Sequence, residues 1–226
     1  MASLSNLSKY CGNYEQWKQT IRNHGLKWEN TSGIEAFLSI LNSNINEIEA
    51  WLYQVVKALP KDYATVLVFD ALTGLRPSEA CMSCRLISEV SDKNMLEQYF
   101  DRELMMLQHF KFPNLFLRNS KNAYISFISP KLLEVVQQIK PKIMYGALDT
   151  RIGRLGFKVQ TKQLRKLHGT ILRNRGIPQE LIDLTHGRIS QNVFTRFYYK
   201  PFLQHVRDIT LKALEPLQQQ LLTMFS

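Results

Sequence analysis

A succession of helix-like segments, each ended by glycine or proline, constrains the fold of this 226-residue chain more than any other feature. The clearest segment is DYATVLVFDALTG, residues 62–74, an apolar-rich helix that Gly74 can end because glycine readily adopts a left-handed conformation. Pro77 suits the first turn of a following helix, where Glu79 faces the positive end of the helix dipole. These start and stop signals predict a mostly helical protein.

Further helices are predicted on both sides of this pair. Asn44 and Glu47 can form a capping box ahead of INEIEAWLYQVVKAL, which Pro60 ends. Other helical patterns cover residues 14–28, 34–41, 130–140, 161–176 and 177–187, and an amphipathic segment runs from about 202 to the end. We therefore predict an N-terminal helical extension or linker at 1–44 and one main domain at 45–226.

One region departs from the helical pattern. LFLRNSKNAYISFISP, residues 115–130, predicts two short β runs around the turn residues Asn119, Ser120 and Asn122. A helix is expected over residues 95–108, and a connection rich in glycine and arginine over 149–160. The predicted fold is thus mainly α, within the α+β class, with a small antiparallel β element.

Composition bounds the class of protein. The 45% hydrophobic content indicates a folded chain, and no apolar run has the roughly 20 residues that span a bilayer. The N-terminus lacks an apolar signal-peptide core, and three cysteines do not form a disulfide framework, so we expect an intracellular protein. Cys81 and Cys84 form a lone C-x-x-C, which is more typical of small apolar residues on a helix than of a zinc site or redox pair.

Positive charge is concentrated in one stretch. Residues 151–212 hold 13 Lys or Arg and 3 Asp or Glu, whereas the rest of the chain holds 16 of each sign. The net charge of +10 therefore lies within about sixty residues. A solvated basic face is one interpretation, but this concentration favours a polyanionic partner, most simply the phosphates of nucleic acid.

The distribution of acids bears on the chemistry of such a partner. Cleavage of a phosphodiester needs metal ions or fixed cations to neutralise the charge that grows on the phosphate oxygens. The carboxylates of this chain are scattered, so the pattern favours Arg and Lys over a two-metal site, and neither metal nor cofactor is expected. Arginine donates two hydrogen bonds to two phosphate oxygens, and tyrosine can supply the nucleophile.

Three stretches carry these residue types. The first is ALTGLRPSEA, where Glu79 can reach back to Arg76. The second is TKQLRKLHGTILRNRGI, where Lys162 and Arg165 share a helix face. The third is LTHGRISQNVFTRFYYKP, in which Arg188 follows Arg165 by 23 residues and precedes Tyr198 by ten.

With these motifs in this order, the chain resembles the tyrosine recombinases, or phage-type integrases, over roughly residues 60–200. TGLRPSE matches the first motif of that family, and KQLR places Arg165 on its second arginine. Lys162 stands where the family usually has histidine, and Arg188 where it usually has histidine or tryptophan. These departures, together with GRISQNVFTRFY, are most similar to the integrases of archaeal spindle-shaped viruses.

The resemblance implies a role for each matched residue. Tyr198 is the expected nucleophile and Tyr199 a packing residue or a second DNA contact, although a slip of one residue in the alignment would exchange them. Arg76 and Arg165 are expected to hold the scissile phosphate, and Glu79 to orient Arg76. Lys162 and Arg188 are expected to add positive charge. The family also uses a lysine from a β-hairpin, for which Lys121 is chosen over its rivals Lys111 and Arg118.

Further basic residues are expected to contact DNA. They are Lys158, Lys166, His168, Arg173 and Arg196, with a helix contact as the alternative for His168. His186 is interpreted as a helix-terminal residue, because LTH lies two residues early for the family's histidine.

The resemblance predicts a site-specific DNA recombinase that integrates viral or plasmid DNA through a 3′-phosphotyrosyl intermediate. Its implied partners are double-stranded attachment sites and a homo-tetramer on DNA, in the host cytoplasm. The segment ahead of the first motif is short for the core-binding domain that integrases usually carry, so the chain is either a fragment or a compact enzyme. The C-terminal helix can pack in cis or on a neighbour. The rivals are an inactive DNA-binding module, a type IB topoisomerase-like relaxing enzyme and an RNA-processing protein.

Overall fold

The computed structural model describes residues 2–25, 33–41, 44–118, 121–139, 143–189 and 197–225. The chain divides into two compact units, Met1–Asn44 and Ile45–Ser226. The first unit contains α1 (Ala2–Tyr10), α2 (Tyr14–Asn23) and α3 (Gly33–Leu41). The α1 and α2 helices contact each other, and the ammonium groups of Lys9 and Lys18 lie 4.9 and 4.8 Å from the centre of the Tyr14 ring.

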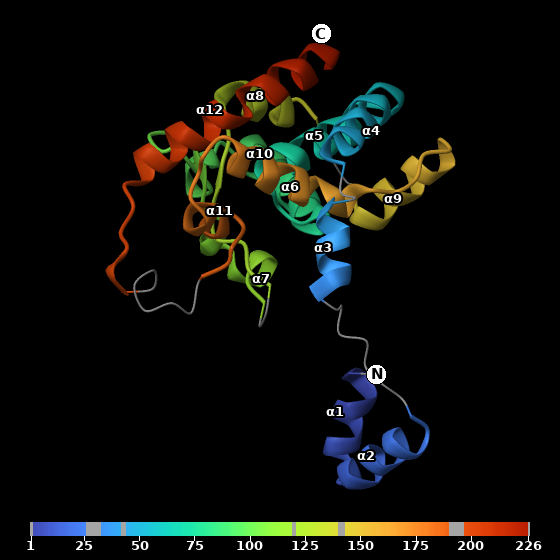
Figure 1. Cartoon of the computed structure of the whole chain (residues 1–226). Helices are drawn as coiled ribbons and strands as arrows, with labels where there is room; N and C mark the ends of the chain where they lie inside the picture. The colour runs from blue at the N-terminus through green and yellow to red at the C-terminus, as the bar shows by residue number, and fades with distance from the viewer. Residues whose placement is uncertain are drawn as a thin grey trace. The chain divides into compact units, whose positions relative to one another are not determined.

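The second unit is a helical domain with a small sheet (Figure 1). Its α-helices among the described residues are α4 (Ile45–Ala58), α5 (Lys61–Thr73), α6 (Pro77–Asp92), α7 (Pro113–Phe116), α8 (Pro130–Gln137), α9 (Tyr145–Arg154), α10 (Leu164–Asn174), α11 (Gln179–Thr185) and α12 (Leu203–Leu222). This composition confirms the predicted mainly α fold. The α9 helix corrects the expectation of an irregular connection from residue 149, because Leu148 and Ile152 bury one of its faces.

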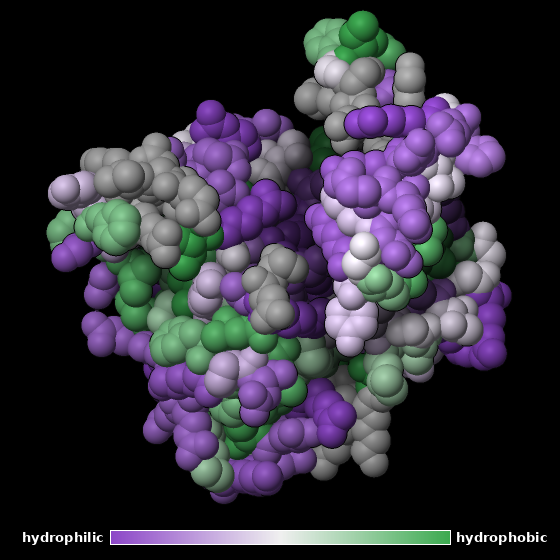
Figure 2. Space-filling model, turned by 90° about the horizontal axis from the view of Figure 1, so that it is seen from below, coloured by the Kyte–Doolittle hydropathy of each residue, from purple (hydrophilic) through white to green (hydrophobic). Residues whose placement is uncertain are grey.

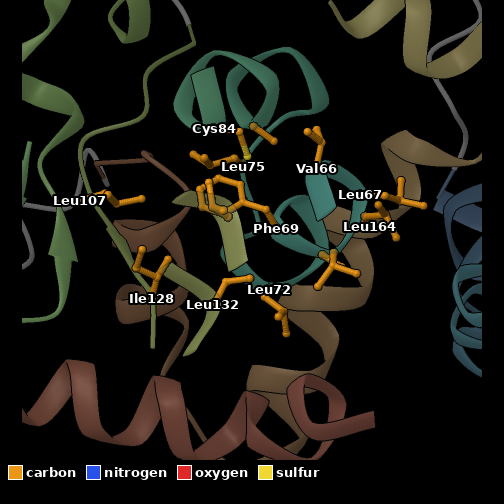
Figure 3. Close-up of a cluster of buried hydrophobic side chains, with 14 of the residues drawn as sticks. Val66, Leu67, Phe69, Leu72, Leu75, Cys84, Leu107, Ile128, Leu132 and Leu164 are labelled. Atoms are coloured by element: carbon orange, nitrogen blue, oxygen red, sulfur yellow. The ribbon is translucent and has the colours of Figure 1, made fainter. Parts of the chain in front are cut away.

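The α5 helix forms the centre of the second unit. Every residue from Ala64 to Thr73 is buried, because α4, α6, α8, α10 and α12 all contact this helix. Figure 3 shows Leu67, Phe69 and Leu72 of α5 among core side chains that come from α6, α8, α10 and the sheet. Burial of each large apolar side chain contributes roughly 1.5–3 kcal/mol to the stability of the fold. The position of α5 is therefore well fixed, including its C-terminal end, which leads to Arg76.

Cys81 and Cys84 belong to this apolar core. Both are buried free thiols in α6, and burial raises the pKa of Cys81 to about 12. Their burial among apolar side chains agrees with the interpretation of the C-x-x-C as part of a helix.

The β element differs from the prediction. Strands β1 (Phe100–Asp101), β2 (Met106–Leu107) and β3 (Ser126–Phe127) form an antiparallel sheet in the order β1-β2-β3. The expected helix over 95–108 is wrong, since this segment makes the β1–β2 hairpin. The carboxylate of Asp101 accepts a hydrogen bond from Leu104 N at 2.9 Å, and this turn replaces helical hydrogen bonds.

The expected pairing of two β runs within residues 115–130 is also wrong. Pro113 starts α7 in place of the first run, and the second run pairs with β2. A buried chain of hydrogen bonds fixes this arrangement: Ser83 Oγ to Tyr99 Oη (2.8 Å), Tyr99 Oη to His109 Nδ1 (2.6 Å) and His109 Nε2 to Ser126 Oγ (2.9 Å). Such long-range partners are invisible to local patterns. The turn residues Asn119 and Ser120 lie outside the described residues.

The C-terminal helix packs in cis. Val206, Leu214 and Leu221 of α12 are buried, and Ser129 Oγ at the start of α8 donates a hydrogen bond of 2.7 Å to Gln218 Oε1. In Figure 1, α12 lies beside α8 and α10. The sequence left open whether this helix packs on its own chain or on a neighbouring one, and in the structure it packs on its own chain.

Candidate active site

The turn between α5 and α6 holds Arg76. Gly74 ends α5 in a left-handed conformation (φ 62°), and Arg76 then occupies an extended position directly before Pro77. Glu79 is fully buried and accepts two hydrogen bonds from Arg76, from Nη1 at 2.8 Å and from the backbone N at 3.0 Å. The side chain of Arg76 remains 25% exposed. Glu79 therefore fixes the guanidinium while leaving part of it open to solvent.

Arg165 lies in the first turn of α10 and joins two other segments. Its Nη1 donates a hydrogen bond of 2.8 Å to the carbonyl of Gly74, and its Nη2 donates to the carbonyl of His186 at the end of α11. Burial, followed by the positive charges of Arg76 and Arg188, lowers the pKa of Arg165 to about 10. Arg76 and Arg188 are thus each close enough to Arg165 to repel its charge, and an anion beside Arg165 would relieve that repulsion.

Two buried histidines stand behind Arg165. His168 Nδ1 is 3.0 Å from His186 Nε2, and both side chains are buried. Burial and the charge of Arg165 lower the pKa of His168 to about 3. Burial, the His168 ring and the nearby arginines lower the pKa of His186 to about 2, so both rings are neutral near pH 7. A Cβ on Gly74 would lie 2.4 Å from His168 Nδ1. The first motif therefore needs glycine both for its turn and for this ring.

This geometry corrects one prediction. His168 is only 1% exposed, so it does not present its ring to DNA. Its place on the buried face of α10, against Gly74, makes it a packing partner of the turn that carries Arg76. His186 is the C-terminal cap residue of α11, as interpreted from the sequence.

The loop that carries Lys121 meets the same place. Lys121 is exposed, and the carbonyl of the next residue, Asn122, accepts a hydrogen bond of 3.4 Å from Arg76 Nη1. The Asn122 carbonyl also lies against the α-carbon of Gly187. Contacts of the Asn122 carbonyl, with the Arg76 side chain and with the backbone of Gly187, therefore bring together the Arg76 turn, the Lys121 loop and the turn after α11. Among the described residues, no hydrogen bond or ion pair joins the rival residues Lys111 and Arg118 to the Arg76 turn.

The remaining predicted site residues lie at the surface. Lys162 is exposed in a short 3₁₀ turn, Thr161–Gln163, directly before α10. Arg188 is also exposed, with Nη1 3.5 Å from a carboxylate oxygen of Asp183. The side chain of Tyr198 is 72% exposed, and within the part of the chain that the structure describes no hydrogen bond joins it to the arginines. Tyr199 is half-buried and packs against the core.

The residues predicted to contact DNA, apart from His168, lie at the surface where the structure describes them. Lys158, Lys166 and Arg173 are exposed, whereas Arg196 lies outside the described residues. Figure 2 shows hydrophilic surface interrupted by exposed apolar residues. Among the large apolar residues exposed along the chain are Ile189, Phe197 and Phe202, which flank the tyrosine pair in sequence.

Comparison with known proteins identifies the family. A family model described as archaeal phage integrase matches residues 46–207. The chain belongs to this family. No curated protein and no solved structure matched the chain. It is therefore an integrase-type DNA recombinase, and DNA is its partner.

The described residues were also searched for other kinds of site. No group of three or more His, Cys, Asp and Glu side chains among them could hold a metal ion. None of the helices in the described ranges is long and apolar enough to cross a membrane.

Sequence reasoning missed three residues that lie close to the arginines of the candidate site. Asn122 and Gly187 make their contacts through backbone atoms, so a search for side-chain motifs does not find them. Asp70 is different, because it is a single acid inside the apolar run of α5 and its side chain is fully buried. Neither carboxylate oxygen of Asp70 has a hydrogen-bond partner among the described residues. A lone acid in such a run was the available signal.

Asp70 makes stability depend on pH. Burial raises its pKa well above the ordinary 3.8, and the partial attraction of Arg165 does not offset this. The folded protein therefore keeps a proton that the unfolded chain loses, so this residue's contribution falls as pH rises from about 4 through the folded-state pKa. We expect Asp70→Asn to raise the free energy of unfolding at pH 7 by about 1–3 kcal/mol. Urea unfolding at pH 4 to 8 should show an advantage of the variant that grows with pH, and parallel curves would contradict this assignment.

Proposed function

We propose that this integrase is a tyrosine recombinase that cleaves and rejoins DNA through a 3′-phosphotyrosyl intermediate. The observation that carries the proposal is the convergence of Arg76 and Arg165 on one junction of the chain. Arg165 bonds the carbonyl of Gly74, two residues before Arg76, and the positive charge of Arg76 contributes to the lowered pKa of Arg165. A phosphate is the anion that best fits two planar forks, because each can bind two oxygens.

In the proposed reaction the phenol oxygen of Tyr198 attacks the scissile phosphorus. The phenol loses its proton to solvent, a bond forms between its oxygen and the phosphorus, and the bond to the 5′-oxygen breaks. The ammonium group of Lys121 gives a proton to that departing 5′-oxygen. A 5′-hydroxyl from a partner strand then reverses the step and releases the tyrosine, so the energy of the phosphodiester is conserved without a nucleotide cofactor.

The arginines supply the charge that this reaction needs. Arg76 and Arg165 would hold the non-bridging oxygens, while Lys162 and Arg188 would add positive potential. Glu79 contacts Arg76 through both carboxylate oxygens and fixes its geometry before DNA arrives. Preorganised donors of this kind stabilise a developing phosphorane without reorganisation at the moment of reaction. Lys158, Lys166 and Arg173 would contact the backbone outside the cleaved position.

The wider assignment follows from the same proposal. Residues 45–226 would be the catalytic domain and residues 1–44 an extension. The substrate would be double-stranded attachment sites, the biological event the integration of viral or plasmid DNA in a host cytoplasm, and the assembly a tetramer on DNA. Arg196 would be a further backbone contact.

A suicide duplex tests the proposed function. In this substrate a nick just downstream of the scissile phosphate lets the short 5′-hydroxyl fragment diffuse away, so the covalent intermediate accumulates. The full chain with a labelled attachment-site duplex, in EDTA, should give a band that migrates with the protein on a denaturing gel and disappears after protease treatment. No such band under conditions where gel shifts show bound DNA would contradict the proposal.

One observation favours a second function, that of a catalytically inactive DNA-binding module. Among the described contacts none links the exposed Tyr198 to Arg76 or Arg165. A module of this kind would bind DNA with the same salt dependence, since phosphate contacts determine that slope. It would form no adduct, so the suicide duplex separates the two functions.

A further inference from the structure

Gly187 makes the closest backbone approach among the described glycines. It adopts a left-handed conformation (φ 64°), and a Cβ built on it would lie 1.9 Å from the carbonyl oxygen of Asn122 and 3.0 Å from the α-carbon of Ala123. No side chain fits between these backbones. The turn after α11 therefore rests directly on the loop that carries Lys121.

The loop under Gly187 is held by its own hydrogen bonds. The side-chain oxygen of Asn122 accepts from Arg118 N at 2.8 Å, its amide donates to Tyr124 Oη at 3.0 Å, and Ala123 N donates to Phe116 O at 3.0 Å. These contacts direct the Asn122 carbonyl to Arg76 Nη1 at 3.4 Å. The loop is thus held by its own hydrogen bonds and also contacts the backbone of Gly187, and we expect its position to depend on both.

We propose that the contact between Gly187 and Asn122 positions Lys121 as the proton donor to the departing 5′-oxygen. This inference rests on the proposed function and adds a residue that sequence motifs do not supply. Lys121 directly precedes Asn122, so the backbone point that touches Gly187 also sets where the lysine chain begins. A displacement of about 1 Å at a group that transfers a proton is enough to slow the reaction on the order of 10²-fold.

The contact between Gly187 and Asn122 also lies close to Arg165, Arg188 and Arg76. Gly187 lies between His186, whose carbonyl accepts a hydrogen bond from Arg165, and Arg188. Asn122 gives its carbonyl to Arg76. Arg76 is also held by Glu79, and Arg165 by the carbonyl of Gly74, so each arginine keeps a partner outside this contact. We therefore expect a substitution at Gly187 to displace the Lys121 loop more than the arginines, and to impair proton donation more than phosphate binding.

The test uses two DNA substrates and the full chain. One is the ordinary suicide duplex, and in the other a sulfur atom replaces the bridging 5′-oxygen at the scissile phosphate. The sulfur leaves as a thiolate, which is stable near pH 8.5 without a proton donor. We expect Gly187→Ala to cleave the ordinary duplex about 10²-fold more slowly than the wild type and the sulfur duplex within about threefold of it, as for Lys121→Ala.

Gly176→Ala is the matched control. Gly176 is also left-handed (φ 82°), but a Cβ there meets no atom within 4 Å, so this variant carries the backbone strain without the collision. It should cleave both substrates within about threefold of the wild type. Asn122→Ala is a second variant that keeps the carbonyl but releases the loop, and it should be impaired on the ordinary duplex and restored on the sulfur duplex.

Each outcome bears on a different claim. Equal losses of Gly187→Ala on both substrates, or normal cleavage of the ordinary duplex, would overturn the positioning role. Failure of the sulfur duplex to restore Lys121→Ala would overturn it as well, while leaving the phosphotyrosyl reaction intact. Absence of any adduct with the wild-type chain would instead refute the proposed function. Thermal melts of every variant show which losses come from unfolding.

Discussion

Replacing Tyr198 with phenylalanine is expected to abolish covalent DNA–protein adducts while leaving DNA affinity within about twofold. The substitution removes one oxygen and nothing else, and that oxygen is the proposed nucleophile. Removal of a nucleophile costs on the order of 10⁴-fold or more in rate. The side chain is 72% exposed, so its hydroxyl supports no packing in the free protein and stability should not change. Adduct yield on a suicide duplex and affinity from gel shifts measure the two effects separately.

Tyr199→Phe is the matched control for this experiment. Tyr199 is half-buried and packs against the core, so its ring matters to the fold. Phenylalanine keeps that ring, and we expect adduct formation within about threefold of the wild type. Adducts that persist in Tyr198→Phe and vanish in Tyr199→Phe would reassign the nucleophile to the neighbouring residue.

Replacing Arg165 with alanine is expected to slow cleavage by about 10²–10³-fold, the loss typical of removing one donor from a site that stabilises developing negative charge. The side chain also bonds the carbonyls of Gly74 and His186, so alanine leaves both acceptors without this partner. Burial and the nearby arginines lower the pKa of Arg165 to about 10, which still leaves it charged at neutral pH. Single-turnover cleavage at saturating protein isolates the chemical step.

Arg173→Ala and Arg165→Lys separate the roles of charge and position. Arg173 lies on the same helix but is exposed, and its Nη1 is 3.3 Å from the carbonyl of Ile177. Its loss should weaken DNA binding and reduce the salt slope by about one, with little effect on single-turnover cleavage. Arg165→Lys keeps the charge without the planar fork and should fall between alanine and wild type. Similar cleavage defects for Arg165→Ala and Arg173→Ala would argue against a special place for Arg165.

Helix start and stop signals in the sequence correctly predicted the helices whose ends are set by local backbone requirements. Gly74 and Pro77 mark the turn between α5 and α6 because left-handed backbone and a fixed φ are local requirements. The residues of the β1–β2 hairpin misled the same reasoning, since Tyr99, Met106 and Leu107 also suit a helix. Their strand conformation depends on β3 and on the buried hydrogen bonds to His109 and Ser126, which no local window contains.

In the candidate site, too, residues with local motifs could be predicted, whereas contacts that depend on the fold could not. Motifs and their spacing predicted Arg76, Glu79 and Arg165 as site residues, and the structure places Glu79 against Arg76 and Arg165 against the carbonyl of Gly74. Asn122 and Gly187 could not be predicted because every residue has a backbone carbonyl and an α-carbon, so these groups leave no signal in the sequence. Only the fold brings these two residues, 65 positions apart, into contact. His168 was misplaced because a histidine in a basic helix looks like a DNA contact until its burial is known.

Mapping the covalent bond between protein and DNA is the decisive experiment on the phosphotyrosyl reaction. The full chain is incubated in EDTA with the suicide duplex, the adduct is digested with trypsin and nuclease, and the modified peptide is sequenced by mass spectrometry. We expect a nucleotide joined through its 3′-phosphate to Tyr198, with the same yield whether or not divalent ions are present. A nucleotide attached to any other residue, or cleavage that requires a divalent ion and leaves no protein on the DNA, would contradict it.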